Sequence, residues 1–176
     1  ATGMHPPMMA GQVAEKLGLH KGEIKWRCNS CRDGSLYVSI GRIGKVDVRI
    51  DRGVARADLR IIVSSVSPHF QAGFGGGYRL IVPGCAHIET IRQLNRLGLG
   101  RTDRQLVGTE PSGNAMRSVI DASGVLMDQH NGRSFAVQYL LDDESQPSSI
   151  TAGEVIPTQR MVAKQCAAAC GIVTSF

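Results

Sequence analysis

With 176 residues, of which 42% are hydrophobic, the chain can bury the core of one domain, and it contains no run of the roughly 18 apolar residues that a membrane helix requires. Five cysteines are too few for a disulfide scaffold in a chain of this length, and their odd number leaves at least one thiol unpaired within a monomer. The net charge of +5 favours acidic partners. We therefore expect a soluble protein that is cytoplasmic, or exported after a leader is removed.

The N-terminal part predicts an extended segment followed by a short helix. Two consecutive prolines keep residues 1–9 extended. Apolar residues recur at helical spacing over residues 10–17, and Gly18 can adopt the left-handed conformation that ends a helix. We assign residues 10–176 to a single domain.

Alternating apolar residues in the middle of the chain predict strands with one buried face. Residues 45–51 and 56–63 both alternate strictly, which places Leu59, Ile61 and Val63 on the buried side. A four-residue loop at 52–55 would set oppositely charged side chains against each other on the outer face. The pattern therefore predicts an antiparallel hairpin.

The rest of the chain predicts a mixture of strands and helices. The glycine-rich stretch 71–77 reads as a flexible connection, and residues 142–151 as an exposed one. The predicted elements, in chain order, are a strand at 78–82, a helix at 86–97, strands at 117–120, 125–127 and 134–141, and a helix at 158–169. The expected fold class is α+β, with an antiparallel sheet, helices packed on one of its faces, and short N-terminal and C-terminal helices.

Four cysteines form a candidate metal site. Cys28 and Cys31 make a C-x-x-C pair, and Cys166 and Cys170 lie four residues apart on one face of the last predicted helix. Four thiolates can hold zinc tetrahedrally. A local redox-active or disulfide pair, and two small residues buried in an alanine-rich helix, are the alternatives. We expect no cofactor, with zinc as the alternative.

Cys85 is the candidate nucleophile. It lies where the predicted strand meets the predicted helix, with His87 two residues further on. A helix N-terminus lowers the pKa of a thiol by favouring its anion. His69, His87 or His130 could serve as the base only if the fold brings one of them close, and the alternative is a packed cysteine.

Two groups of basic residues are candidates for binding phosphates. Residues 12–27 are similar to the first half of a helix-turn-helix motif, and this resemblance implies that Lys21, Lys25 and Arg27 contact a nucleic-acid backbone. Gly22 departs from the pattern because it would lie inside the recognition helix.

The second group consists of Arg92 and Arg96, one helical turn apart, followed by Arg101 and Arg104. An aromatic platform for stacking bases is missing. A solvated basic face is the alternative interpretation of both groups.

No catalytic motif is complete, and the glycine-rich stretch fits neither nucleotide-binding fingerprint. The sequence therefore favours a non-enzymatic binding or assembly module whose arginine-rich surface engages an acidic protein or a nucleic acid. A cysteine-dependent hydrolase or transferase built on Cys85 is the alternative function.

Overall fold

The computed structural model describes residues 4–18, 25–99, 107–109 and 113–172. The helices are α1 (Ala10–Leu17), α2 (Arg52–Arg56), α3 (Ile88–Leu99), α4 (Ala115–His130) and α5 (Val155–Ala169), with short 3₁₀ helices η1 (Gly34–Leu36) and η2 (Gly77–Leu80). The strands are β1 (Tyr37–Ile43), β2 (Val46–Asp51), β3 (Leu59–Ser65), β4 (Pro68–His69), β5 (Gly73–Phe74), β6 (Arg133–Leu141) and β7 (Pro147–Glu154).

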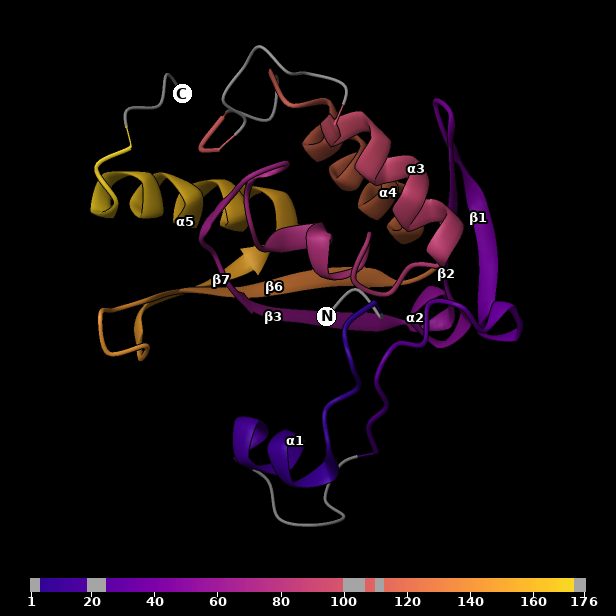
Figure 1. The fold of residues 1–176 in the computed structure, drawn as a ribbon, viewed down its shortest axis with the longest axis horizontal. Coiled ribbons are helices and arrows are strands. Elements are labelled where there is room, and N and C mark those ends of the chain that lie inside the picture. Colours follow the sequence, from indigo (N-terminus) through magenta and orange to yellow (C-terminus); the bar gives the residue numbers. More distant parts are fainter. Residues whose placement is uncertain (1–3, 19–24, 100–106, 110–112, 173–176) are drawn as a thin grey trace.

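The expected α+β class is confirmed, with small sheets, helices packed against them and a helix near the C-terminus. The main sheet has the strand order β3-β6-β7, in which β3 runs parallel to β6 and β7 runs antiparallel to it. Helices α3, α4 and α5 lie on one side of this sheet (Figure 1). The pairing is therefore mixed rather than purely antiparallel.

The hairpin predicted from residues 45–63 is wrong. Strand β2 pairs with β1, so Arg49 lies opposite Ser39 instead of Asp58. The chain leaves β2 through a helix because the Asp51 side chain accepts hydrogen bonds from the backbone N–H groups of Gly53 (2.8 Å) and Val54 (3.1 Å). An aspartate at this position is a strong N-cap, and it starts α2 where the sequence pattern suggested a turn.

The face of β3 that alternation assigned to the core points outward. Leu59, Ile61 and Val63 are 58%, 56% and 55% exposed, whereas Ile62 and the charged Arg60 are buried. Burial of Arg60 is compensated by an ion pair with Asp128 at 3.1 Å and by backbone carbonyl acceptors, including that of Val54 at 2.8 Å.

Two predicted strands, at 117–120 and 125–127, are parts of the single helix α4. Asn114 caps this helix by accepting a hydrogen bond from the backbone N–H of Arg117 at 2.9 Å. The predicted strand at 78–82 is also wrong, because the chain there forms η2 and the turn after it.

The helices α3 and α5 and the strand β6 are confirmed, with shifted ends. Residues 142–148 are exposed as expected, although β7 begins within the stretch predicted as a connection. No helix in the described part of the chain is long and apolar enough to cross a membrane.

The core lies between α4, η2 and the inner face of the sheet, where Tyr78, Ile120, Met127 and Ala136 belong to one buried cluster. Tyr78 reaches through this cluster to donate a hydrogen bond from its hydroxyl to Asp128 at 2.7 Å. Helix α4 approaches the tyrosine ring at Gly124, where an added Cβ would lie 2.0 Å from a ring carbon. The absent side chain is therefore what permits this close packing.

Replacing Gly124 by Ala is expected to destabilise the fold by about 1–3 kcal/mol, because the ring of Tyr78 is buried and must shift to admit the methyl group. Denaturant unfolding followed by circular dichroism measures the change. Gly113→Ala is the matched control, since a Cβ there meets no atom within 4 Å. Equal stability of the two variants would contradict this account of α4 packing.

Candidate functional site

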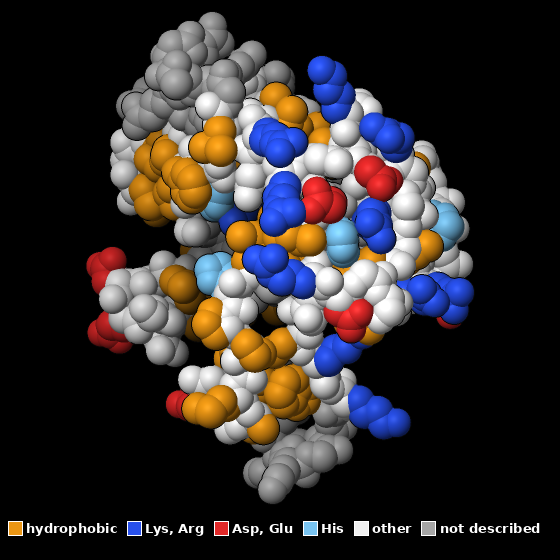
Figure 2. Space-filling model, turned by 45° about the vertical axis from the view of Figure 1, so that its right-hand side comes forward, with side chains coloured by type: hydrophobic (Ala, Val, Ile, Leu, Met, Phe, Trp, Pro, Cys, Tyr) orange, Lys and Arg blue, Asp and Glu red, His pale blue; other side chains and the backbone are white. Residues whose placement is uncertain are grey.

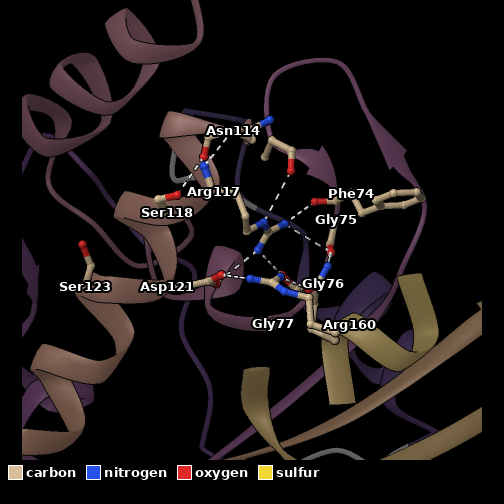
Figure 3. A network of polar contacts seen from close by, with 12 residues as sticks. Phe74, Gly75, Gly76, Gly77, Asn114, Arg117, Ser118, Asp121, Ser123 and Arg160 are labelled. Atoms are coloured by element: carbon tan, nitrogen blue, oxygen red, sulfur yellow. Dashed lines mark hydrogen bonds and ion pairs between the residues drawn. The ribbon is translucent and has the colours of Figure 1, made fainter. Parts of the chain in front are cut away.

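The glycine-rich stretch Gly73–Gly77 is buried and held in place, which corrects the expectation of a flexible connection. It starts as β5, pairs with β4 and leads into η2. Its backbone carbonyl groups face a guanidinium from α4 (Figure 3). The conformation of this stretch sets the positions of His69 before it and Arg79 after it.

Arg117 is the centre of that arrangement. Its buried guanidinium donates hydrogen bonds to the backbone carbonyls of Ala72, Phe74, Gly75 and Gly76, at 3.4 Å to three of them. Burial lowers its pKa to about 10, and the nearby Asp121 carboxylate opposes that shift.

Asp121 joins Arg117 to helix α5. Its carboxylate lies 3.6 Å from the Arg117 guanidinium and also pairs with Arg160 of α5 (Figure 3). Two helices and the glycine stretch are thus tied together by one buried charge network.

Two glutamines complete the support of the glycine stretch. Gln138 of β6 accepts a hydrogen bond from the backbone N–H of Gly77 at 2.8 Å, and Gln159 of α5 donates one to the carbonyl of Gly75 at 3.0 Å. Gly76 has φ of 75°, and a Cβ there would lie 2.2 Å from the Gln138 side-chain oxygen. A side chain at this position is therefore excluded both by backbone strain and by steric overlap.

His69 and Arg79 meet beside this stretch. Nδ1 of His69 accepts hydrogen bonds from the backbone N–H groups of Gln71 (3.2 Å) and Ala72 (3.1 Å), which assigns the proton of the neutral ring to Nε2. Nε2 lies 2.7 Å from a guanidinium nitrogen of Arg79. Two donors therefore face each other, and Nε of Arg79 is buried without an acceptor.

The surroundings of His69 keep its imidazole neutral. Burial, and after it the positive charges of Arg79 and Arg117, together lower the pKa of His69 to about 4. An anionic oxygen beside the pair, within reach of both side chains, would accept hydrogen bonds from both and relieve the conflict between donors. The pair therefore has the chemistry of a site for a small anion such as a carboxylate.

A thiolate nucleophile at Cys85 does not fit its position. Burial, and after it the nearby Asp51 carboxylate, raise the pKa of this thiol to about 11, so the group is a neutral thiol near pH 7. Nδ1 of His87 lies 3.3 Å from the backbone N–H of Glu89, which donates to it, and the His87 ring packs edge-on against Tyr37. The predicted pairing of Cys85 with His87 has no hydrogen bond to support it among the described contacts.

The four cysteines of the predicted zinc site do not converge. Cys31 packs in a small cluster with residues at the start of α3, whereas Cys166 packs in a separate cluster on α5. All five cysteines carry free thiols. Within the described ranges, no three His, Cys, Asp or Glu side chains lie close enough to hold a metal ion.

The predicted basic residues do not form one patch. Arg92 is paired with Glu89 at 2.5 Å, Arg27 is paired with Asp51, and Arg96 and Lys25 are exposed. Figure 2 shows Lys and Arg side chains on that face interspersed with acidic and uncharged ones. Lys21, Arg101 and Arg104 lie outside the described residues.

Comparison with known proteins identifies the family. The model of the lactate racemase N-terminal domain matches residues 1–105, which is more than half of the chain. Lactate racemase of Lactiplantibacillus plantarum is 28% identical over 161 residues, covering 88% of this chain and 36% of that protein. The chain therefore belongs to the lactate racemase N-terminal domain family.

Two solved structures share the fold. A protein from Thermotoga maritima superposes with a TM-score of 0.82 at 17% identity, covering 96% of this chain and 44% of that one. The lactate racemase apoprotein from Thermoanaerobacterium thermosaccharolyticum superposes with a TM-score of 0.81 at 19% identity. The match covers 94% of this chain and 39% of that one. The chain thus spans less than half the length of each protein it resembles.

The family assignment overturns two predictions made from the sequence. A non-enzymatic module that binds an acidic partner is wrong, because the relatives form a family of racemases. The alternative, a cysteine-dependent hydrolase or transferase, is wrong for the same reason. The sequence indicated His69 only as a possible base for Cys85, and it did not indicate Arg79 or Arg117. The conformation of the glycine stretch brings these residues together, and no local sequence pattern predicts that conformation.

Arg117→Met is expected to lower the free energy of unfolding by more than about 3 kcal/mol, since it leaves several buried carbonyls without a donor. Arg160→Met is the matched control and should cost less, because Arg160 is partly exposed and Asp121 keeps its contact with Arg117. Denaturant unfolding of both variants tests the difference, and equal losses would refute the central role of Arg117.

The imidazole of His69 is expected to stay neutral down to about pH 4 in the folded protein. Because its folded pKa lies below the unfolded one, stability contributed by this group is present above pH 6.5 and is lost as the pH falls towards 4. NMR titration of the ring protons, assigned with His69→Gln, measures the pKa. Arg79→Met should raise it by removing a neighbouring positive charge, and an unchanged value would contradict the contact.

Proposed function

We propose that this chain contributes the carboxylate-binding part of a 2-hydroxy-acid racemase, with Arg79 and His69 as the residues that contact the substrate. The observation that supports this most directly is the pair itself, in which two donors face each other with no acceptor between them. Lactate, the substrate named for the relatives, carries a carboxylate next to a hydroxyl group. These two groups match a guanidinium beside an imidazole N–H.

In this proposal Arg79 binds the carboxylate through charge-assisted hydrogen bonds, which the low polarity of its surroundings strengthens. Nε2–H of His69 then donates to an oxygen of the substrate. A neutral imidazole suits this role because it can stabilise developing negative charge on oxygen without adding a positive charge beside Arg79.

The buried network behind the pair supports the same interpretation. Arg117, Gln138 and Gln159 fix the glycine stretch between the two side chains, so their separation is set by the scaffold rather than by the substrate. Preorganised donors of this kind need no rearrangement when charge develops during a reaction.

The lactate racemase family uses a nickel-pincer nucleotide cofactor, so the expectation of no cofactor, with zinc as the alternative, is wrong for this family. The His69–Arg79 pair itself offers no place for a metal ion, because the guanidinium of Arg79 lies where a cation next to Nε2 of His69 would have to sit. The roles assigned to His69 and Arg79 concern the substrate alone.

Binding of lactate enantiomers to the full chain tests this proposal. NMR titration is expected to shift the resonances of residues 69–79, and Arg79→Met should weaken binding roughly 10- to 100-fold by removing hydrogen bonds to a charged group. Arg92→Met is the matched control, since Arg92 is an exposed arginine paired with Glu89 outside the site. A loss of binding in the control as large as in Arg79→Met would refute the proposal.

Racemisation itself is the second readout, measured by chiral chromatography on protein isolated from a host that makes the cofactor. His69→Ala is expected to lower kcat by about 100- to 1,000-fold, the usual effect of losing one donor to a developing oxyanion. Arg79→Met should act mainly on KM. Unchanged kinetics in both variants would place the substrate elsewhere.

A further inference from the structure

The main sheet carries an apolar face that the described part of the chain leaves largely exposed. Its rows are set by the strand register, in which Ile61 of β3 lies beside Phe135 of β6, and Val63 beside Val137. Ile61 and Val63 are more than half exposed, and Phe135 is 40% exposed. Ile150 of β7 lies opposite Tyr139 of β6 and belongs to the same face, and it is 66% exposed. Exposed apolar side chains that form a contiguous surface mark an interaction site.

The direction of the strands also bears on whether this face is normally covered. β3 and β6 run parallel within a mixed sheet, and wholly parallel sheets occur almost only where both faces are covered. Here α3, α4 and α5 lie on one side, and the other side of β3 has the N-terminal segment, the described chain from residue 25 to β1, and helix α1, with no helix packed on the strand (Figure 1). Apart from the paired Arg60, the residues of β3 from Leu59 to Val63 are apolar, so both faces of this strand carry apolar side chains.

The free edge of β3 borders an empty groove. Among the described strands, β6 is the neighbour of β3 on one side and none lies on the other. A pocket of about 770 Å³ lies beside β3. Its lining includes Ile61 and Val63 of β3, the N-terminal residues 6–8, and polar residues such as Arg27 and Asp51. An unpaired edge presents backbone donors and acceptors that another strand can pair with.

We propose that a further α/β polypeptide segment docks here, adding a strand to the free edge of β3 and a helix over the apolar face, and that it is the segment which lactate racemases carry outside the matched region. The lengths of the related proteins support this assignment. The L. plantarum enzyme has almost two thirds of its chain outside the match, and more than half of each solved chain lies outside the superposed part. The proposal concerns the sheet and does not depend on the substrate assigned to His69 and Arg79.

The test is co-expression of tagged residues 1–176 with the portions of L. plantarum lactate racemase that lie outside its matched 161 residues. The untagged portion is expected to co-purify at a 1:1 ratio. Amide hydrogen exchange in β3 should slow at least tenfold in the complex, because the strand edge becomes paired.

Ile61→Lys places a charge on the apolar face and is expected to reduce the retained partner at least tenfold. Met161→Lys is the matched control, an equally exposed apolar residue on α5 across the sheet, and should leave capture unchanged. Circular dichroism of the isolated variants confirms that they fold, as expected for substitutions at exposed positions.

Three results would overturn the proposal. The first is no capture by the unmodified chain, and the second is equal loss of capture in both variants. The third is a stable dimer of residues 1–176, seen by light scattering and abolished by Ile61→Lys, because a second copy would then occupy the face. Capture that depends on Ile61 and not on Met161 supports the proposal.

Discussion

The buried guanidinium of Arg117 is the interaction on which the rest of the structure depends. A charge removed from water is stable only when it is paired and fully hydrogen-bonded, and this one meets both conditions through backbone carbonyls of the glycine stretch and the Asp121 carboxylate. Because the acceptors are backbone atoms, the conformation of the stretch is fixed without any particular side chains there. Glycine at position 76 follows from the same constraint.

The candidate site is a consequence of that fixed backbone. β4 and η2 approach each other across the stretch, and their side chains His69 and Arg79 meet as two donors. Buried polar groups without a hydrogen-bond partner are rare in proteins, and Nε of Arg79 is one of them. The chain belongs to the lactate racemase N-terminal domain family, and the proposed ligand of this pair is an anion.

The sheet and the site belong to different faces of the domain. One face of the sheet is covered by α4 and α5, which also carry the charge network behind the site. On the opposite face, apolar side chains of β3 are exposed. The candidate site and the proposed docking surface therefore lie on different faces of the sheet.

The sequence by itself determined the fold class, the helices α3 and α5 and the strand β6, because their periodicity reflects local geometry and one buried face. Only the tertiary structure decided which face of β3 is buried and that residues 115–130 form one helix. Arg60 is buried because Asp128, 68 residues away, pairs with it, and no local pattern contains that information. The contact between His69 and Arg79 depends in the same way on Arg117, which approaches the glycine stretch from a distant helix.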